Sequence, residues 1–171
     1  MGRPRIRMKP DAPSTPMWGR GWLIGVRSVD LRLAPFPERD AAGVETSLTG
    51  DFKPGLRYDL RGTFDGQVLT VTQLLPSHAQ SELSPRELPG LVAHPRPLFR
   101  EVLEDLESQP WFNELSLGMM TDWDSSSRQP HGAALFLRYV TREVRVWAQG
   151  KPKGMFRIYP LISRHRHLLA P

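Results

Sequence analysis

Residues 55–76 carry the pattern that most constrains the fold, two runs of alternating side chains around an Asp-Gly pair. In the first run, Tyr58 and Leu60 alternate with polar residues, and the second run alternates in the same way. Asp65 and Gly66 suit a tight turn, because glycine accepts the positive φ that such turns require. The sequence therefore predicts a β-hairpin at the centre of a mainly β fold.

Other period-two runs predict further strands on both sides of this hairpin. Residues 22–33 are expected to form one long strand, bent near Ser28, and residues 44–49 a short one. In the last third of the chain we expect three strands, at residues 133–140, 143–148 and 155–162.

Helical spacing of apolar residues occurs between these two groups of strands. Pro97 suits the first turn of a helix over 97–108. The apolar residues that fall at helical spacing there are Leu98, Phe99, Val102, Leu103 and Leu106. Residues 111–120 are expected to resume as a second short helix. Prolines and polar residues on both sides predict irregular connections.

The order of strands, helix and strands predicts a mainly β fold with a helical insertion (β/α+β), either a small antiparallel barrel or a curved sheet, with a capping helix around 97–108. A length of 171 residues fits one domain. The expected organisation is a flexible, basic, proline-rich arm over 1–17, a single β-rich domain over 18–162 with the helical insertion at 76–132, and a basic tail over 163–171.

The stretch Gly55–Pro76, GLRYDLRGTFDGQVLTVTQLLP, resembles the middle hairpin of oligonucleotide-binding (OB) barrels. In those barrels a tyrosine-bearing strand that ends in glycine turns into a strand of alternating valines and threonines, and a helix interrupts the strand order. The resemblance implies an OB-like fold. Another small antiparallel barrel and a curved sheet remain the alternatives.

Positive charge is concentrated at the two ends of the chain. Residues 1–39 contain eight basic and three acidic side chains, and residues 133–171 contain eight and one. Between them, residues 40–95 contain four and seven, and residues 96–132 three and seven. All but four of the 23 basic residues are arginine, which binds phosphate in a fork and stacks on rings. This segregation favours a polyanionic partner, and internal neutralisation of the acidic middle is the alternative.

The alternation in the C-terminal strands predicts one sheet face on which aromatic rings and arginines interleave. Such surfaces bind single-stranded nucleic acid, because bases stack on the rings while arginines contact phosphates. The alternative is that the helix at 97–108 or a partner chain covers the rings. The predicted nucleic-acid-binding residues are Phe136, Arg138, Arg145, Trp147, Lys151, Lys153, Arg157 and Tyr159.

Clusters that suggest catalysis are sparse. Asp122 and Asp124 flank Trp123, with His131 nearby, which is how a metal-dependent hydrolase site can begin, although a polar turn explains the same residues. A histidine pair in the tail lacks the further ligands that a metal site needs. The absence of cysteine excludes disulfides, thiolate zinc sites and a cysteine nucleophile. We therefore expect no catalytic residue, metal or cofactor, and no enzymatic activity.

The leading hypothesis is a nucleic-acid-binding protein that prefers single-stranded DNA or RNA. The alternative is a non-catalytic interaction or assembly subunit, whose aromatic sheet face binds a partner protein or a second copy of the chain. No apolar run approaches the roughly 20 residues that span a bilayer, and the N-terminus lacks an apolar signal core. We expect a cytoplasmic protein with no membrane partner.

Overall fold

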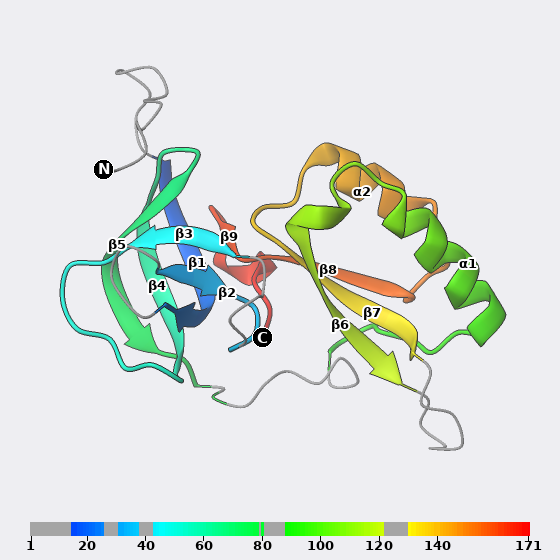
Figure 1. The fold of residues 1–171 in the computed structure, drawn as a ribbon, viewed down its shortest axis with the longest axis horizontal. Helices are drawn as coiled ribbons and strands as arrows, with labels where there is room; N and C mark the ends of the chain where they lie inside the picture. Colours follow the sequence, from blue (N-terminus) through cyan, green and yellow to red (C-terminus); the bar gives the residue numbers. More distant parts are fainter. Residues whose placement is uncertain (1–14, 26–30, 38–42, 79, 81–87, 122–129) are drawn as a thin grey trace.

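The computed structural model describes residues 15–25, 31–37, 43–78, 80, 88–121 and 130–171. Within them, the first half of the chain forms a closed five-strand β-barrel, and the second half forms a three-stranded sheet with two helices (Figure 1). The mainly β class with added helices is as the sequence predicts.

The barrel closes because its first strand pairs with both the second and the fourth. The strand order around it is β1-β2-β3-β5-β4, returning to β1. β3 and β5 run parallel, so the barrel is mixed rather than purely antiparallel. The strands are β1 (Thr15–Ile24), β2 (Arg32–Ala34), β3 (Val44–Ser47), β4 (Arg57–Phe64) and β5 (Val68–Pro76).

The predicted hairpin is confirmed as β4 and β5. The two strands pair antiparallel, and Gly66 between them has a φ of 99°. The Asp65 carboxylate accepts hydrogen bonds from the main-chain N–H groups of Gln67 and Val68 at 2.8 and 2.7 Å, which fixes the turn. Local turn chemistry therefore sets this part of the barrel, as expected from the Asp-Gly pair.

The prediction of a single strand over residues 22–33 is wrong, because the two ends of this range belong to two different strands, β1 and β2. Leu23 in β1 pairs with Leu33 in β2 in antiparallel register, so the chain reverses between them. The barrel core comprises Leu23, Leu31, Leu33, Val44, Tyr58, Leu60, Phe64, Leu69, Leu161 and Ile162.

The second half of the chain builds a sheet in the order β6-β7-β8, with β7 and β8 parallel. Both helices pack on one of its faces, where Leu135 and Leu137 meet Val102, Leu106 and Val144. The elements are α1 (Arg96–Glu107), a 3₁₀ turn at Phe112–Glu114, β6 (Leu115–Thr121), β7 (Pro130–Leu137), α2 (Arg142–Gln149) and β8 (Phe156–Pro160).

The helix expected at 97–108 is confirmed as α1, with a proline in its first turn. It packs against β7 and does not cap the barrel. All five barrel strands precede α1 in the chain, so the helix is not inserted between barrel strands. The order of strands, helix and strands thus reflects two consecutive structures rather than one interrupted barrel.

Two local predictions in this half are wrong. Residues 143–148, expected as a strand, lie in α2, whose first turn is capped by the Thr141 hydroxyl accepting from the Val144 N–H at 3.3 Å. Residues 111–120, expected as a helix, form the 3₁₀ turn and β6, because Leu115 pairs with Leu137 and is buried in the sheet core.

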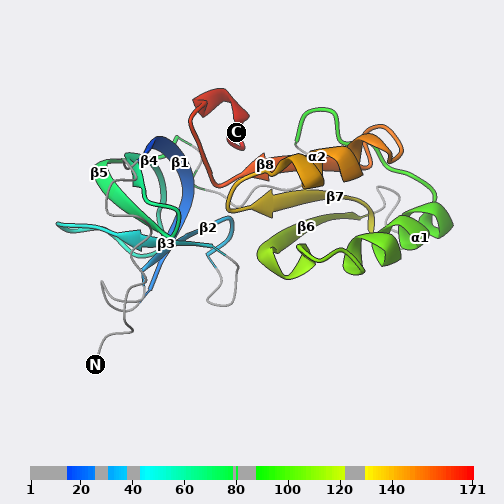
Figure 2. The ribbon, with the colours of Figure 1, turned by 90° about the horizontal axis from the view of Figure 1, so that it is seen from above.

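The C-terminal end of the chain joins the two halves. β9 (Ile162–Ser163) pairs with β1, and residues 164–171 fold between the barrel and β8, through a 3₁₀ turn at Arg166–Leu168 (Figure 2). Leu169 and Ala170 are buried. We call residues 164–171 the C-terminal segment. The segment assigned to a basic tail by sequence is thus folded against the rest of the chain.

Candidate functional site

The predicted aromatic face on the C-terminal strands is covered within the chain. Phe136 on β7 and Tyr159 on β8 do lie side by side on one face, with ring centroids 5.8 Å apart. They are only 4% and 6% exposed, because Leu88, Ala170 and Phe36 pack over them. The prediction that these rings are exposed for base stacking is therefore wrong.

Trp147 does not join these rings. It lies on α2, which packs on the opposite face of the sheet, and its indole N–H donates to Asp105 Oδ2 at 2.9 Å. Lys151 Nζ bonds the same oxygen at 2.6 Å and lies 4.9 Å from the Trp147 ring centroid. Both bonds hold the pKa of the Asp105 carboxyl below its usual range. This cluster connects α1 to the end of α2.

The other predicted binding residues are exposed but do not form one surface with these rings. Arg138 follows β7, Arg145 lies on α2, and Lys153 lies in the turn before β8. Arg157 is exposed on β8, with its guanidinium 5.8 Å from the Tyr159 ring. A binding role for these four residues stays a prediction.

The candidate hydrolase residues cannot be assembled into a site. Asp122 and Asp124 lie outside the described residues, and so does the side chain of His131. Within the described part of the chain, no group of three or more histidine, aspartate or glutamate side chains is arranged to hold a metal ion.

A different surface of the barrel brings tryptophan and arginine together. On β1, Gly19 faces the barrel interior, where an added Cβ would lie 2.8 Å from Leu60, so the alternate residues face outward. Trp18 is paired with Arg61 on β4, and Trp22 with Arg57. We call these outward residues the β1–β4 outer strip, which comprises Trp18, Arg20, Trp22, Arg57, Asp59 and Arg61.

One end of the strip is open to solvent. The half-buried Trp18 ring lies 4.3 Å from the guanidinium carbon of Arg61 and 5.4 Å from that of Arg166. Both arginines are exposed. Arg166 also lies 3.7 Å from a carboxylate oxygen of Asp59. This end therefore presents a partly exposed ring with two positively charged planar groups over it.

The other end of the strip is covered. Trp22 and Arg57 are only 6% and 3% exposed. The Arg57 guanidinium donates to the main-chain oxygen of Pro171 at 2.8 Å, and the Arg20 guanidinium to that of Ala170 at 2.7 Å. Burial, followed by the neighbouring Arg20, lowers the pKa of Arg57 to about 10, against the effect of Asp59.

Sequence reasoning missed this strip, although its signal is present. Trp18, Arg20 and Trp22 alternate with Gly19 and Gly21, so the small residues mark the inner side and the large ones the outer side. The partner arginines alternate in the same way around the strand of the predicted hairpin. The register that places Trp18 opposite Arg61 depends on the pairing of β1 with β4, which no local pattern reveals.

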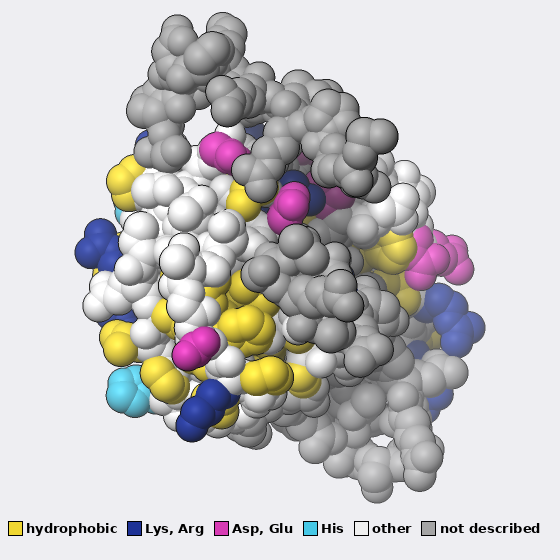
Figure 3. Space-filling model, turned by 60° about the vertical axis from the view of Figure 1, so that its left-hand side comes forward, with side chains coloured by type: hydrophobic (Ala, Val, Ile, Leu, Met, Phe, Trp, Pro, Cys, Tyr) yellow, Lys and Arg dark blue, Asp and Glu magenta, His cyan; other side chains and the backbone are white. Residues whose placement is uncertain are grey.

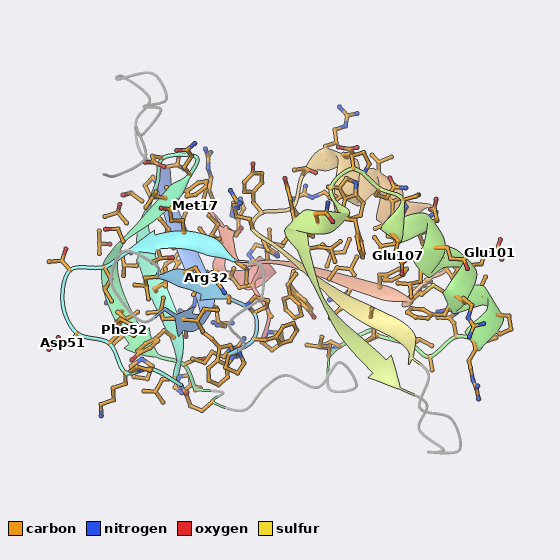
Figure 4. The ribbon with its side chains drawn as sticks, in the orientation of Figure 1. Met17, Arg32, Asp51, Phe52, Glu101 and Glu107 are labelled. Carbon is orange, nitrogen blue, oxygen red and sulfur yellow. The ribbon has the colours of Figure 1, made fainter. Side chains whose placement is uncertain are left out.

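Away from the β1–β4 outer strip, the surface carries acidic and apolar side chains in several places. Asp51 projects from the loop before β4 at one end of the molecule, and Glu101 and Glu107 from α1 at the other (Figure 4). The side of the barrel seen in Figure 3 shows apolar side chains with scattered charges around them. Apolar barrel residues that remain partly exposed are Met17, Leu48, Phe52, Leu56, Val71 and Leu74.

No protein-family model matches this chain, and neither the curated proteins nor the solved structures include one with significant similarity to it. Among the described residues, neither helix has the length and apolarity needed to cross a membrane.

Proposed function

We propose that this protein binds single-stranded nucleic acid through the open end of the β1–β4 outer strip. The observation that carries the proposal is the partly exposed Trp18 residue, whose ring centroid lies within 5.4 Å of the guanidinium carbons of two exposed arginines. A base stacks on such a ring, which contributes about 1–3 kcal/mol per base, and the arginines bind the adjacent phosphates. The function inferred from sequence is kept, and its site moves from the C-terminal sheet to the barrel.

Local charge supports this assignment. The strip and Arg166 together contain four arginines and one aspartate. Arg164, His165 and His167 are exposed in the adjoining C-terminal segment, so the excess of positive charge continues beyond the strip. Arginine in such a patch attracts a phosphate backbone independently of its sequence. An OB-like relationship is part of this proposal. The closed five-strand barrel supports it, and the position of α1 after the barrel does not.

The test is a fluorescence anisotropy titration of a labelled oligothymidylate at low salt, with single variants of the full chain. We expect Trp18→Ala to weaken binding about 5- to 100-fold, as the loss of one stacked base requires. Tyr139→Ala is the matched control, because this ring is 47% exposed and lies off the strip. Equal binding by the Trp18 variant and the wild type would exclude the site.

A second pair of variants separates this site from the residues predicted by sequence. Arg61→Ala removes one guanidinium of the strip, whereas Arg145→Ala removes one on α2, with the same change in net charge. We expect the loss of affinity to follow Arg61. A larger loss for the Arg145 variant would restore the predicted residues of the C-terminal half as the binding surface.

The interaction-subunit hypothesis retains one specific observation. Leu75 on β5 is 56% exposed and lies opposite Asp59 on the outer side of the barrel. A large exposed apolar side chain suits a protein partner better than a phosphate backbone. Light scattering after size-exclusion chromatography tests it, because a stable oligomer that is indifferent to oligonucleotide and is dissociated by Leu75→Asp favours this function.

A further inference from the structure

The covered end of the strip has the same chemistry as the open end. Trp22 and Arg57 form a register pair, four residues along each strand from the pair of Trp18 and Arg61. The repeat of tryptophan opposite arginine therefore continues to Arg57, which the C-terminal segment contacts. Because every second residue of a strand faces the same side, both pairs lie on one continuous outer surface.

The C-terminal segment is held there by its buried residues Leu169 and Ala170 and by hydrogen bonds that another ligand can make. Arg20 and Arg57 donate to main-chain oxygens of Ala170 and Pro171, respectively. Within the strip their charges face one carboxylate, that of Asp59, which is bonded to Arg20. A guanidinium bonds a phosphate oxygen more strongly than a carbonyl oxygen, because the acceptor is then ionised. A nucleic-acid backbone thus offers Arg20 a better acceptor than the Ala170 carbonyl, and its phosphates can replace the Pro171 oxygen at Arg57.

We infer that the C-terminal segment is an internal competitor of nucleic acid, and that single-stranded DNA or RNA displaces residues 169–171 to reach a second binding subsite at Trp22, Arg57 and Arg20. This inference rests on the proposed function and describes the regulation of the same site. The open end at Trp18 binds first, because it is already exposed. Displacement of the segment then doubles the number of tryptophan–arginine pairs that contact the strand.

The chain lacks cysteine, which makes a direct test possible. In Ala170→Cys the single thiol replaces a side chain that is 7% exposed, so a thiol-reactive dye labels it only when the segment opens. We expect saturating oligothymidylate of about 20 nucleotides, long enough for several subsites, to accelerate this labelling several-fold. Ala133→Cys is the matched control, because Ala133 is buried in the sheet core and its labelling rate should not change.

A second variant tests the competition without a label. Leu169→Ala removes a buried anchor of the segment and keeps every charge, so we expect several-fold tighter oligonucleotide binding. Adding Trp22→Ala to this variant should abolish the gain, and thermal melting verifies that each variant is folded. If the double variant loses the gain in affinity, the tighter binding of Leu169→Ala depends on Trp22 and not on a general loss of rigidity.

The outcomes distinguish this inference from the function on which it rests. If the oligonucleotide binds with dependence on Trp18 while labelling of Ala170→Cys stays constant or slows, the competitor role is wrong and the binding function stands. If the wild-type chain shows no saturable binding at low salt, both are wrong. Faster labelling of Ala170→Cys, together with tighter binding by Leu169→Ala, supports the competitor role.

Discussion

Whether a ring forms part of a core or of a binding surface is decided by what lies over it. Phe136 and Trp18 are both strand residues with arginine close by in the sequence. Phe136 packs edge-on against Phe36 from the barrel, with centroids 5.3 Å apart, and is buried. Trp18 contacts guanidinium groups and remains partly exposed. The difference arises from long-range packing, which the alternation of side chains along a strand does not reveal.

The Asp105 carboxylate provides a test of a single ionisable residue. Its pKa is lowered by the bonds from Lys151 and Trp147, so the folded state favours the ionised form. The stabilisation is full above the ordinary pKa of an aspartate, near pH 4, and is lost as pH falls through the lowered pKa of the folded state. We expect Asp105→Asn to lower the melting temperature at pH 7 and to lose this effect once the pH is below the lowered pKa of Asp105.

The measurement is a series of thermal melts of both proteins between neutral and acidic pH. Glu107→Gln is the control, because Glu107 is an exposed acidic residue at the end of the same helix. A difference between wild type and Asp105→Asn that stays constant down to pH 2 would contradict the role of this ion pair.

At the scale of elements, α2 shows how a short helix can have the sequence pattern of a strand. Val144 and Val146 are two residues apart, as in a strand, but Val144 is fully buried and Val146 is 58% exposed. The residues that share the core-facing side are Val144 and Trp147, three apart. An eight-residue segment spans barely two turns, so the two periods are hard to separate without the cap at Thr141.

The cap makes a quantitative prediction. The Thr141 hydroxyl accepts from the Val144 N–H, and removal of such a cap typically costs about 1 kcal/mol. We expect Thr141→Ala to lower the free energy of unfolding by this amount in urea denaturation, while Thr141→Ser retains most of it. Thr49→Ala, at an exposed loop position, is the matched control. Equal stability of Thr141→Ala and the wild type would mean that the cap contributes nothing.

The sequence predicted those parts of the fold that are set by local chemistry. The hairpin of β4 and β5 depends on its Asp-Gly turn, and α1 on its apolar stripe and the proline in its first turn, so both were found. Parallel pairing of β3 with β5 and of β7 with β8 depends on contacts between distant segments, and it was not found. The same holds for the candidate site. The sequence indicates tryptophan and arginine as the residue types, but their position on one surface depends on the pairing of β1 with β4.

At the scale of the whole molecule, the fold brings β1 beside the basic C-terminal segment. β1 lies near the start of the chain and β9 near its end, and Trp18 is paired with Ser163 across them. Arginines of the C-terminal segment therefore lie beside those of β1 and β4, as the contact of Arg166 with Trp18 shows. The acidic residues of α1 lie on a different part of the molecule. Charge that is separated along the sequence is thus gathered on one side of the barrel.

This arrangement predicts a specific dependence of binding on salt. Each arginine that neutralises a phosphate releases bound counterions, so the logarithm of affinity falls linearly with the logarithm of salt concentration. Losing one such contact reduces the slope by somewhat less than one unit for a single strand. We expect Arg61→Gln and Arg166→Gln each to reduce the slope by about 0.7. Arg142→Gln, an exposed position on α2, should leave it unchanged. Equal slopes for all three variants would show that the binding energy comes from the overall net charge rather than from the strip.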